Sequence, residues 1–220
     1  MSRTGSFFTS SISRKFMMSL TGIFLMFFLL IHLSINLTLF GGADTFNAAS
    51  EFMGTNPLIF GMQFVLAAGF IYHIFLAIVL TFQNWKARGS QKYYSNKWSE
   101  HTPFNSRSMI WTGVIVLLFL FLHLWNYFIP IKTADQHLDH YELVTELFKD
   151  PIYAALYVIW FIALAIHLSH AFQSSFQSLG LRSGSYIKLF QVLGKIFFWA
   201  ISIGFSVIAI WFFIKGNGMM

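Results

Sequence analysis

Four histidines lie within long apolar segments of this chain, where burying an imidazole is costly unless it finds a partner. They occur one to a segment, at His32, His73, His123 and His167, and His170 follows one helical turn after the last of them. An imidazole in such a position can form a hydrogen bond, relay protons or ligate a metal. The other three histidines lie in polar connections, where we expect solvated surface side chains: His101, His137 and His140.

Two of the buried histidines share one depth. His32 lies nine residues before Gly41, and His123 lies nine residues before Lys132. Because an α-helix rises about 1.5 Å per residue, each imidazole is about 13 Å from that end of its segment. We call this end, which is opposite the N-terminus of the chain, the outer end, and these two histidines the outer pair.

The other two buried histidines share a second depth. His73 lies sixteen residues after Pro57, and His167 lies sixteen residues after Pro151. Each is therefore about 24 Å from the outer end, so this inner pair lies about 10 Å from the outer pair along the membrane normal.

One imidazole from each of two helices at matched depth, twice over, is the ligand set of two bis-histidine haems b. The surrounding phenylalanine and leucine side chains suit a porphyrin, and Gly22, Gly69 and Gly113 are predicted to admit its close approach. The alternative is a histidine-based transporter or proton channel, which needs charged groups along a path. Only Lys195, near the inner start of the fifth segment, provides one within a segment. A reduced-minus-oxidised absorption spectrum distinguishes the two hypotheses.

The segments that carry these histidines are long enough to cross a membrane. The chain is 56% hydrophobic and only 10% charged, whereas about 25% of a soluble domain is charged. A hydrocarbon core requires about 20 apolar residues in a helix, and five runs qualify: 16–40, 58–85, 109–131, 152–177 and 189–214. They predict an all-α integral membrane protein with one domain over residues 1–220, in which four helices form a haem-binding bundle. The absence of cysteine excludes thiolate metal sites, iron–sulfur ligation and covalently attached haem.

Charge predicts the orientation of these segments. Lysine and arginine are concentrated in the N-terminal segment and in the connections on its side, whereas the outer connections hold seven of the eight acidic residues. By the positive-inside rule, the N-terminus is cytoplasmic and, after five crossings, the C-terminus lies outside. The net charge of +6 therefore indicates orientation and a docking face on the connection 86–107, and we expect no nucleic-acid partner. The first apolar run is long enough to span, so we expect a retained helix and no cleaved signal peptide.

The first four segments form an internal repeat. The stretch TGIFLMFFLLIHL (21–33) aligns with TGVIVLLFLFLHL (112–124) at six of thirteen positions, including the Thr-Gly and His-Leu dipeptides. The second segment aligns with the fourth so that the proline and the histidine of each coincide. We interpret this as a duplicated two-helix unit followed by a fifth helix.

Several motifs resemble a known family. The stretches SLTGIFLMFFLLIHLSIN, FNAASEFMGTNPLIFGMQFVLAAGFIYHIFLAI, LLFLFLHLWNY and HLSHAFQSSFQSLGL occur in the order found in the single-subunit dihaem cytochrome b anchor of the succinate:quinone oxidoreductases and fumarate reductases. The resemblance implies five transmembrane helices, two haems b and a quinone, usually menaquinone, in a bacterial inner membrane. It implies a flavoprotein partner with FAD, where succinate is oxidised, and an iron–sulfur partner, both on the cytoplasmic side.

The resemblance also implies roles for single residues. His32 and His123 would ligate the outer haem, His73 and His167 the inner haem, and Ser19 would contact a propionate. His170 would instead bind a propionate or pack, and exchange of its role with His167 is the alternative within HLSH. Ala165 stands where some fumarate-reducing members have a glutamate, which favours succinate oxidation.

Quinone reduction takes up two protons, so a carboxylate at the outer edge of the second helix, near the outer haem, would serve as a proton conduit. We predict Glu51 for this role, with His137 and His140 as further candidates. The predicted function is that of the membrane subunit of respiratory complex II, in the tricarboxylic acid cycle, which reduces quinone but does not itself handle succinate. A dihaem cytochrome b of another dehydrogenase, such as a hydrogenase, is the second alternative.

Overall fold

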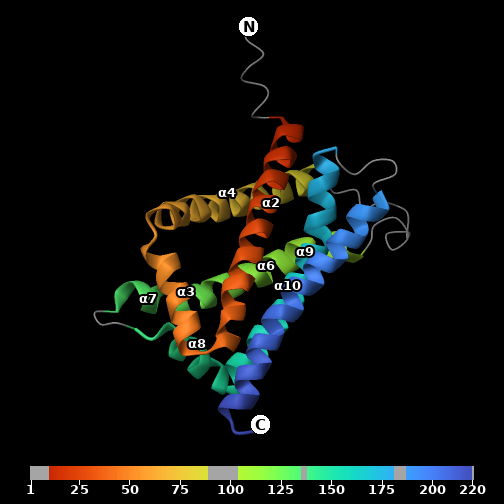
Figure 1. Ribbon diagram of the computed structural model, residues 1–220. Coiled ribbons are helices and arrows are strands. Elements are labelled where there is room, and N and C mark those ends of the chain that lie inside the picture. Colours follow the sequence, from red (N-terminus) through yellow and green to blue (C-terminus); the bar gives the residue numbers. More distant parts are fainter. Residues whose placement is uncertain (1–9, 89–103, 135–137, 181–186, 220) are drawn as a thin grey trace.

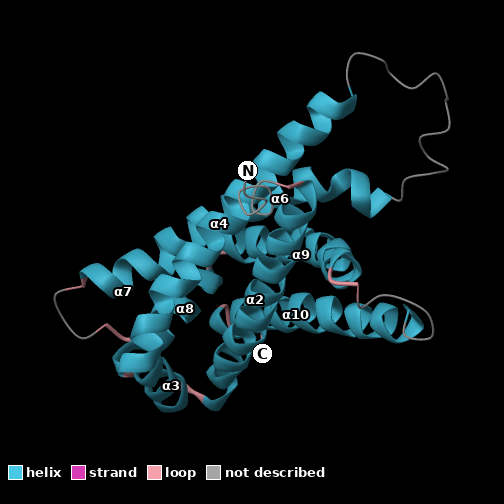
Figure 2. Ribbon diagram, turned by 90° about the horizontal axis from the view of Figure 1, so that it is seen from above, coloured by secondary structure: helices cyan, strands magenta, loops and turns pink. Residues whose placement is uncertain are grey.

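A computed structural model describes residues 10–88, 104–134, 138–180 and 187–219, which form helices joined by short connections (Figures 1 and 2). The all-α class predicted from the sequence is confirmed. The basic connection predicted to dock a partner lies mostly outside the described residues, and so do His101 and His137.

Within the described residues, five helical spans are long and apolar enough to cross a membrane, as predicted. They are formed by α2 (Ser11–Leu37), α4 (Pro57–Arg88), α6 (Phe104–His123) with its continuation, α9 (Pro151–Ser178) and α10 (Ile187–Gly216). The helix α2 begins earlier than predicted, because the Ser10 side chain accepts a hydrogen bond from the Ser13 backbone N–H and caps it. Asp150 caps α9 in the same way, and Pro151 occupies the first helical position.

Both outer connections contain a short helix that the sequence analysis did not predict. After the 3₁₀ turn η1 (Thr38–Gly41), Gly42 adopts a φ of 90°, which favours glycine, and α3 (Ala43–Thr55) follows. The second short helix is α8 (His140–Lys149). Figure 1 shows α3 and α8 together beside the C-terminal ends of α2 and α10, and α3 packs against α8.

The core lies around α9 and α10. These two helices pack closely along each other, α9 also packs against α2 and α6, and α10 against α2. Tyr157, Ile201 and Ala209 are almost completely buried there. By contrast, Phe64, Ile71 and Trp111 on α4 and α6 expose more than 60% of their surface. Such apolar side chains suit contact with lipid, since lipid tails do not penalise them.

A polar connection fixes the start of α8. The Asn47 side chain on α3 donates a hydrogen bond to Asp139 at 2.9 Å and accepts one from the Tyr141 backbone N–H at 2.9 Å. Asp139 is the N-cap of α8 and accepts from the Glu142 backbone N–H. The hydrogen bonds from Glu142 and Asn47 hold the pKa of the Asp139 carboxyl below its ordinary value.

We expect Asp139→Ala to loosen α8 in a pH-dependent manner. Loss of an N-cap costs about 1 kcal/mol. Because the folded pKa is depressed, this stabilisation is present above the unfolded pKa of about 3.9 and is lost as pH falls through the folded value. Amide hydrogen exchange across 140–149, corrected for intrinsic rates, should accelerate at pH 7 and differ less from wild type near pH 3. Asp44→Ala, in the first turn of α3, is the control, and equal protection of α8 in D139A and wild type at pH 7 would contradict the prediction.

Candidate functional site

The outer pair of histidines meets between α2 and α6. The ring centroids of His32 and His123 lie 5.7 Å apart, with the ring planes at 89°. Aromatic rings surround the pair, with centroids 5.1 to 5.6 Å from one or other imidazole: Phe28, Phe119, Tyr127 and Phe205. The Nδ1 atom of His123 is buried and has no hydrogen-bond partner among the described residues. The outer pair is therefore two facing imidazoles in an apolar, aromatic enclosure.

The helix that carries His123 changes its winding immediately after this residue. Leu124–Phe128 form a π-helical segment, η2, in which the Ile129 backbone N–H donates to the Leu124 carbonyl, and α7 (Ile129–Thr133) completes the span. In a regular α-helix, the ring of Pro130 would clash with the carbonyl of Asn126, and the wider turn relieves that clash. Short π-helical segments occur frequently at functional sites. Here the segment directs Asn126 toward α9, where its side-chain amide donates to the Tyr157 hydroxyl at 3.1 Å.

The inner pair joins α4 and α9. His73 lies on α4 and His167 on α9. The Nδ1 atom of His73 lies 3.2 Å from the Thr21 hydroxyl of α2, and Nδ1 of His167 lies 3.4 Å from the Thr112 hydroxyl of α6. Each inner histidine is thus held by a threonine from a neighbouring helix.

The glycines that follow these threonines leave room beside the same imidazoles. A Cβ added to Gly22 would lie 3.7 Å from Cε1 of His73, and one added to Gly113 would lie 3.5 Å from Cε1 of His167. Gly69 was predicted to admit a porphyrin, but it faces a side chain of the protein instead. A Cβ added there would meet the ring of Phe24 at 2.9 Å. We conclude that Gly69 serves close packing of α4 on α2, whereas Gly22 and Gly113 adjoin the inner pair.

The helices that carry each pair are held apart. Within the described residues, α2 packs along α4 and α9, and α6 packs along α9. The backbones of α2 and α6 do not pack along each other there, and neither do those of α4 and α9. Each histidine pair therefore bridges two helices whose spacing is set by other contacts, which is the arrangement needed to hold a flat group between them.

The other predicted residues lie in different surroundings. Ser19 is buried and donates its hydroxyl hydrogen bond to the Lys15 carbonyl. Glu51 lies on α3, a helix separate from the second span on whose edge it was predicted, and its side chain is exposed. His140 begins α8, with Nδ1 2.5 Å from the Ser50 hydroxyl. His170, one turn beyond His167, is partly buried.

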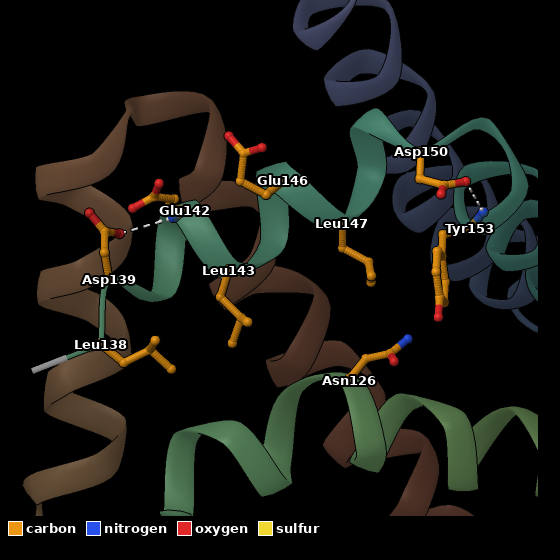
Figure 3. Close-up of a pocket in the computed structure, with 9 residues that line it drawn as sticks. All are labelled: Asn126, Leu138, Asp139, Glu142, Leu143, Glu146, Leu147, Asp150 and Tyr153. Atoms are coloured by element: carbon orange, nitrogen blue, oxygen red, sulfur yellow. Dashed lines mark hydrogen bonds between the residues drawn. The ribbon is translucent and has the colours of Figure 1, made fainter. Parts of the chain in front are cut away.

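An open depression of about 540 Å³, which we call the cavity, lies on the surface between α8 and the π-helical segment. Figure 3 shows Leu138, Leu143 and Leu147 pointing toward the helix that carries Asn126, while Glu142 and Glu146 point away from it. The cavity thus has an apolar floor and an acidic rim. Because Asn126 bonds to Tyr157, whose ring centroid lies 6.3 Å from that of His123, the floor of the cavity is connected to the outer pair.

Comparison with known proteins supplies the family. Residues 91–203 match the family described as the succinate dehydrogenase/fumarate reductase transmembrane subunit, which is more than half of the chain. The chain belongs to this family. The resemblance predicted from the sequence motifs is confirmed. A curated relative, the succinate dehydrogenase cytochrome b558 subunit of Bacillus subtilis (strain 168), is 24% identical over 148 residues, which cover 67% of this chain and 69% of the relative. No solved structure matches this transmembrane subunit.

Proposed function

We propose that this transmembrane subunit is the dihaem cytochrome b that anchors a succinate:menaquinone oxidoreductase and passes electrons from an iron–sulfur subunit to the quinone. The observation that carries the proposal is the facing pair His32 and His123, with ring centroids 5.7 Å apart between two helices. Family membership supports it, and so does the name cytochrome b558 of the relative. Within this family, the alternatives of a transporter and of a hydrogenase subunit have no comparable support.

The residues of both pairs fit a haem b. Two imidazoles bonded to one metal at about 2 Å each have ring centres about 6 Å apart, close to the separation of the outer pair. The helices of each pair do not pack closely along each other in the described residues, and glycines adjoin both inner imidazoles, which supports a group held between the helices. His32 and His123 would hold the outer haem, and His73 and His167 the inner haem. Bis-histidine haem supplies reversible one-electron transfer when bound.

The chain contributes an environment as well as ligands. The aromatic rings around the outer pair exclude water, and a low-dielectric enclosure tunes the reduction potential of the metal it surrounds. Ser19, thirteen residues before His32, is proposed to turn its hydroxyl toward a propionate.

We propose the cavity beside α8 as the quinone site. Its volume of about 540 Å³ lies within the range of about 300 to 1,000 Å³ typical of small-molecule sites. Leucine side chains would contact the apolar parts of the quinone, and Asn126 and Tyr153 present polar groups at the inner wall.

Two carboxylates are candidates for the proton route to this site. Glu51, proposed from the sequence, lies on α3, whereas Glu142 lines the cavity. If Glu51 conducts protons, Glu51→Gln should lower succinate:quinone reductase activity by about 100-fold or more, because acid–base groups usually contribute about 100- to 10,000-fold. Glu142→Gln is the matched control, and succinate reduction of haem should stay normal in both. Loss of activity in E142Q alone would assign the role to the cavity rim instead.

The orientation is also a proposal, with the N-terminus in the cytoplasm and the C-terminus outside. Because the chain has no cysteine, a single cysteine placed by Ser2→Cys or by Met219→Cys gives an unambiguous label. In intact spheroplasts, an impermeant maleimide should label M219C and leave S2C unlabelled until the membrane is opened. The reverse pattern would overturn the orientation.

Purification of the intact complex tests the proposed function. We expect the chain to co-purify with a flavoprotein and an iron–sulfur protein, with two haems b per chain in the reduced-minus-oxidised spectrum. Succinate should reduce these haems, and menaquinol should accumulate. Absence of b-type bands would leave the transporter hypothesis, and co-purification with another dehydrogenase would assign the chain to that enzyme.

A further inference from the structure

The repeated Thr-Gly dipeptide has the same surroundings in both halves of the molecule. Thr21 on α2 contacts His73 on α4, and Thr112 on α6 contacts His167 on α9. In each half, the glycine that follows adjoins the same imidazole. In both halves of the internal repeat, a threonine hydroxyl of one helix therefore lies beside Nδ1 of an inner histidine on another helix.

The direction of these hydrogen bonds follows from the donors available. A threonine hydroxyl has one proton to donate and two lone pairs that accept. The Thr21 hydroxyl donates to the carbonyls of Met17 and Met18 at 3.0 Å, and the Thr112 hydroxyl donates to the Met109 carbonyl at 3.1 Å. Each hydroxyl proton is therefore engaged by the backbone of its own helix, and the oxygen is left to accept.

An accepting threonine fixes the tautomer of the histidine. Because the hydroxyl oxygen accepts, the imidazole must donate from Nδ1, so Nδ1 carries the proton and Nε2 keeps a free lone pair. In both inner histidines the nitrogen left to ligate a metal is then Nε2.

We propose that Thr21 and Thr112 are paired positioning residues that fix the inner histidines as Nε2 ligands and set the reduction potential of the group they hold. This inference rests on the proposed haem function. A hydrogen bond from the distal N–H of a ligating imidazole makes the ligand more basic and orients its ring. A more basic ligand favours the ferric state, so each threonine lowers the potential of the inner haem.

The outer pair provides an internal reference. Nδ1 of His123 has no hydrogen-bond partner among the described residues, so neither threonine bonds this imidazole. Removing a threonine hydroxyl should therefore change the inner haem and leave the outer haem unchanged.

The test compares Thr21→Val and Thr112→Val with Thr21→Ser and Thr112→Ser in the purified intact complex. Valine keeps the shape of threonine without the hydroxyl, whereas serine keeps the hydroxyl. Redox titration of the haem bands should show an upward shift of one of the two midpoint potentials in each valine variant, a larger shift in the double variant, and wild-type values in the serine variants. Electron paramagnetic resonance of the ferric complex should show altered g-values for the same haem alone. Ser34→Ala removes a hydroxyl that bonds the Leu30 carbonyl at an exposed site of α2 and should change neither readout.

The possible results separate the inference from the proposed function. Unchanged potentials and g-values in the valine variants, with both haems present, would overturn the role of the threonines while the dihaem function stands. Equal shifts in the valine and serine variants would also overturn it, because they would reflect packing and not the hydroxyl. A wild-type complex without b-type haem would overturn the proposed function itself.

Discussion

His123→Ala is expected to remove the outer haem from the complex and leave the inner haem in place. His123 is one of two imidazoles in that site, and the rings of Phe119 and Tyr127 beside it carry no nitrogen. Residues that hydrogen-bond a metal ligand typically contribute about 10- to 100-fold to the affinity for the metal. Loss of the ligand itself should therefore weaken haem binding by at least about 100-fold. Haem content should fall from two per chain to one. Succinate:quinone reductase activity should fall by at least about 100-fold, in line with the loss of haem affinity.

The measurement is the haem-to-protein ratio of the purified complex, together with the redox spectrum and quinone reductase activity. His32→Ala should give the same spectrum and activity as H123A, because the two residues share one site. His140→Ala, which removes an imidazole from α8 on the same side of the molecule, is the control and should retain both haems. Retention of two haems in H32A or H123A would refute the assignment of the outer pair.

His167→Ala is expected to interrupt electron entry. The inner pair lies farther from the outer end than the outer pair does, so in the proposed direction of flow it receives electrons first. In H167A the outer haem should remain bound and should be reduced by dithionite, but succinate should no longer reduce it at a measurable rate. His73→Ala should behave in the same way, since His73 and His167 are proposed to hold the same haem.

His170→Ala is the sharp control for this variant, because it lies one turn from His167 on the same helix. The structure distinguishes the two residues: the Thr112 hydroxyl and Gly113 adjoin His167. H170A should therefore retain both haems and most succinate-dependent reduction. Loss of the inner haem in H170A with retention in H167A would reverse the assignment of these two residues.

The positions of the histidines could be predicted because helix geometry converts sequence spacing into depth. Counting residues from Gly41, Pro57 and their counterparts matched His32 with His123, whose rings do meet in the structure, while the matching of His73 with His167 stays a prediction. The partners of the imidazoles could not be predicted in the same way. Contact between Thr21 and His73 depends on how α2 and α4 rotate against each other, and the repeat marked Thr21 only as a recurring residue.

The short outer helices were missed although a signal for one of them was present. Asp139 followed three residues later by Glu142 is typical of a helix start, and Leu143 and Leu147 continue an apolar face. The π-helical segment could not be predicted in detail, because Pro130 marks a disturbed helix but does not show whether it kinks, ends or widens.

The interleaved arrangement of the two pairs has a consequence for synthesis of the chain. The outer site uses the first and third spans and the inner site the second and fourth, so neither can be completed from neighbouring spans. The first site becomes whole only when the third span has entered the bilayer, and the second must wait for one span more. If the two pairs hold the proposed haems, a chain whose synthesis stops between these two points could capture one haem but not the other.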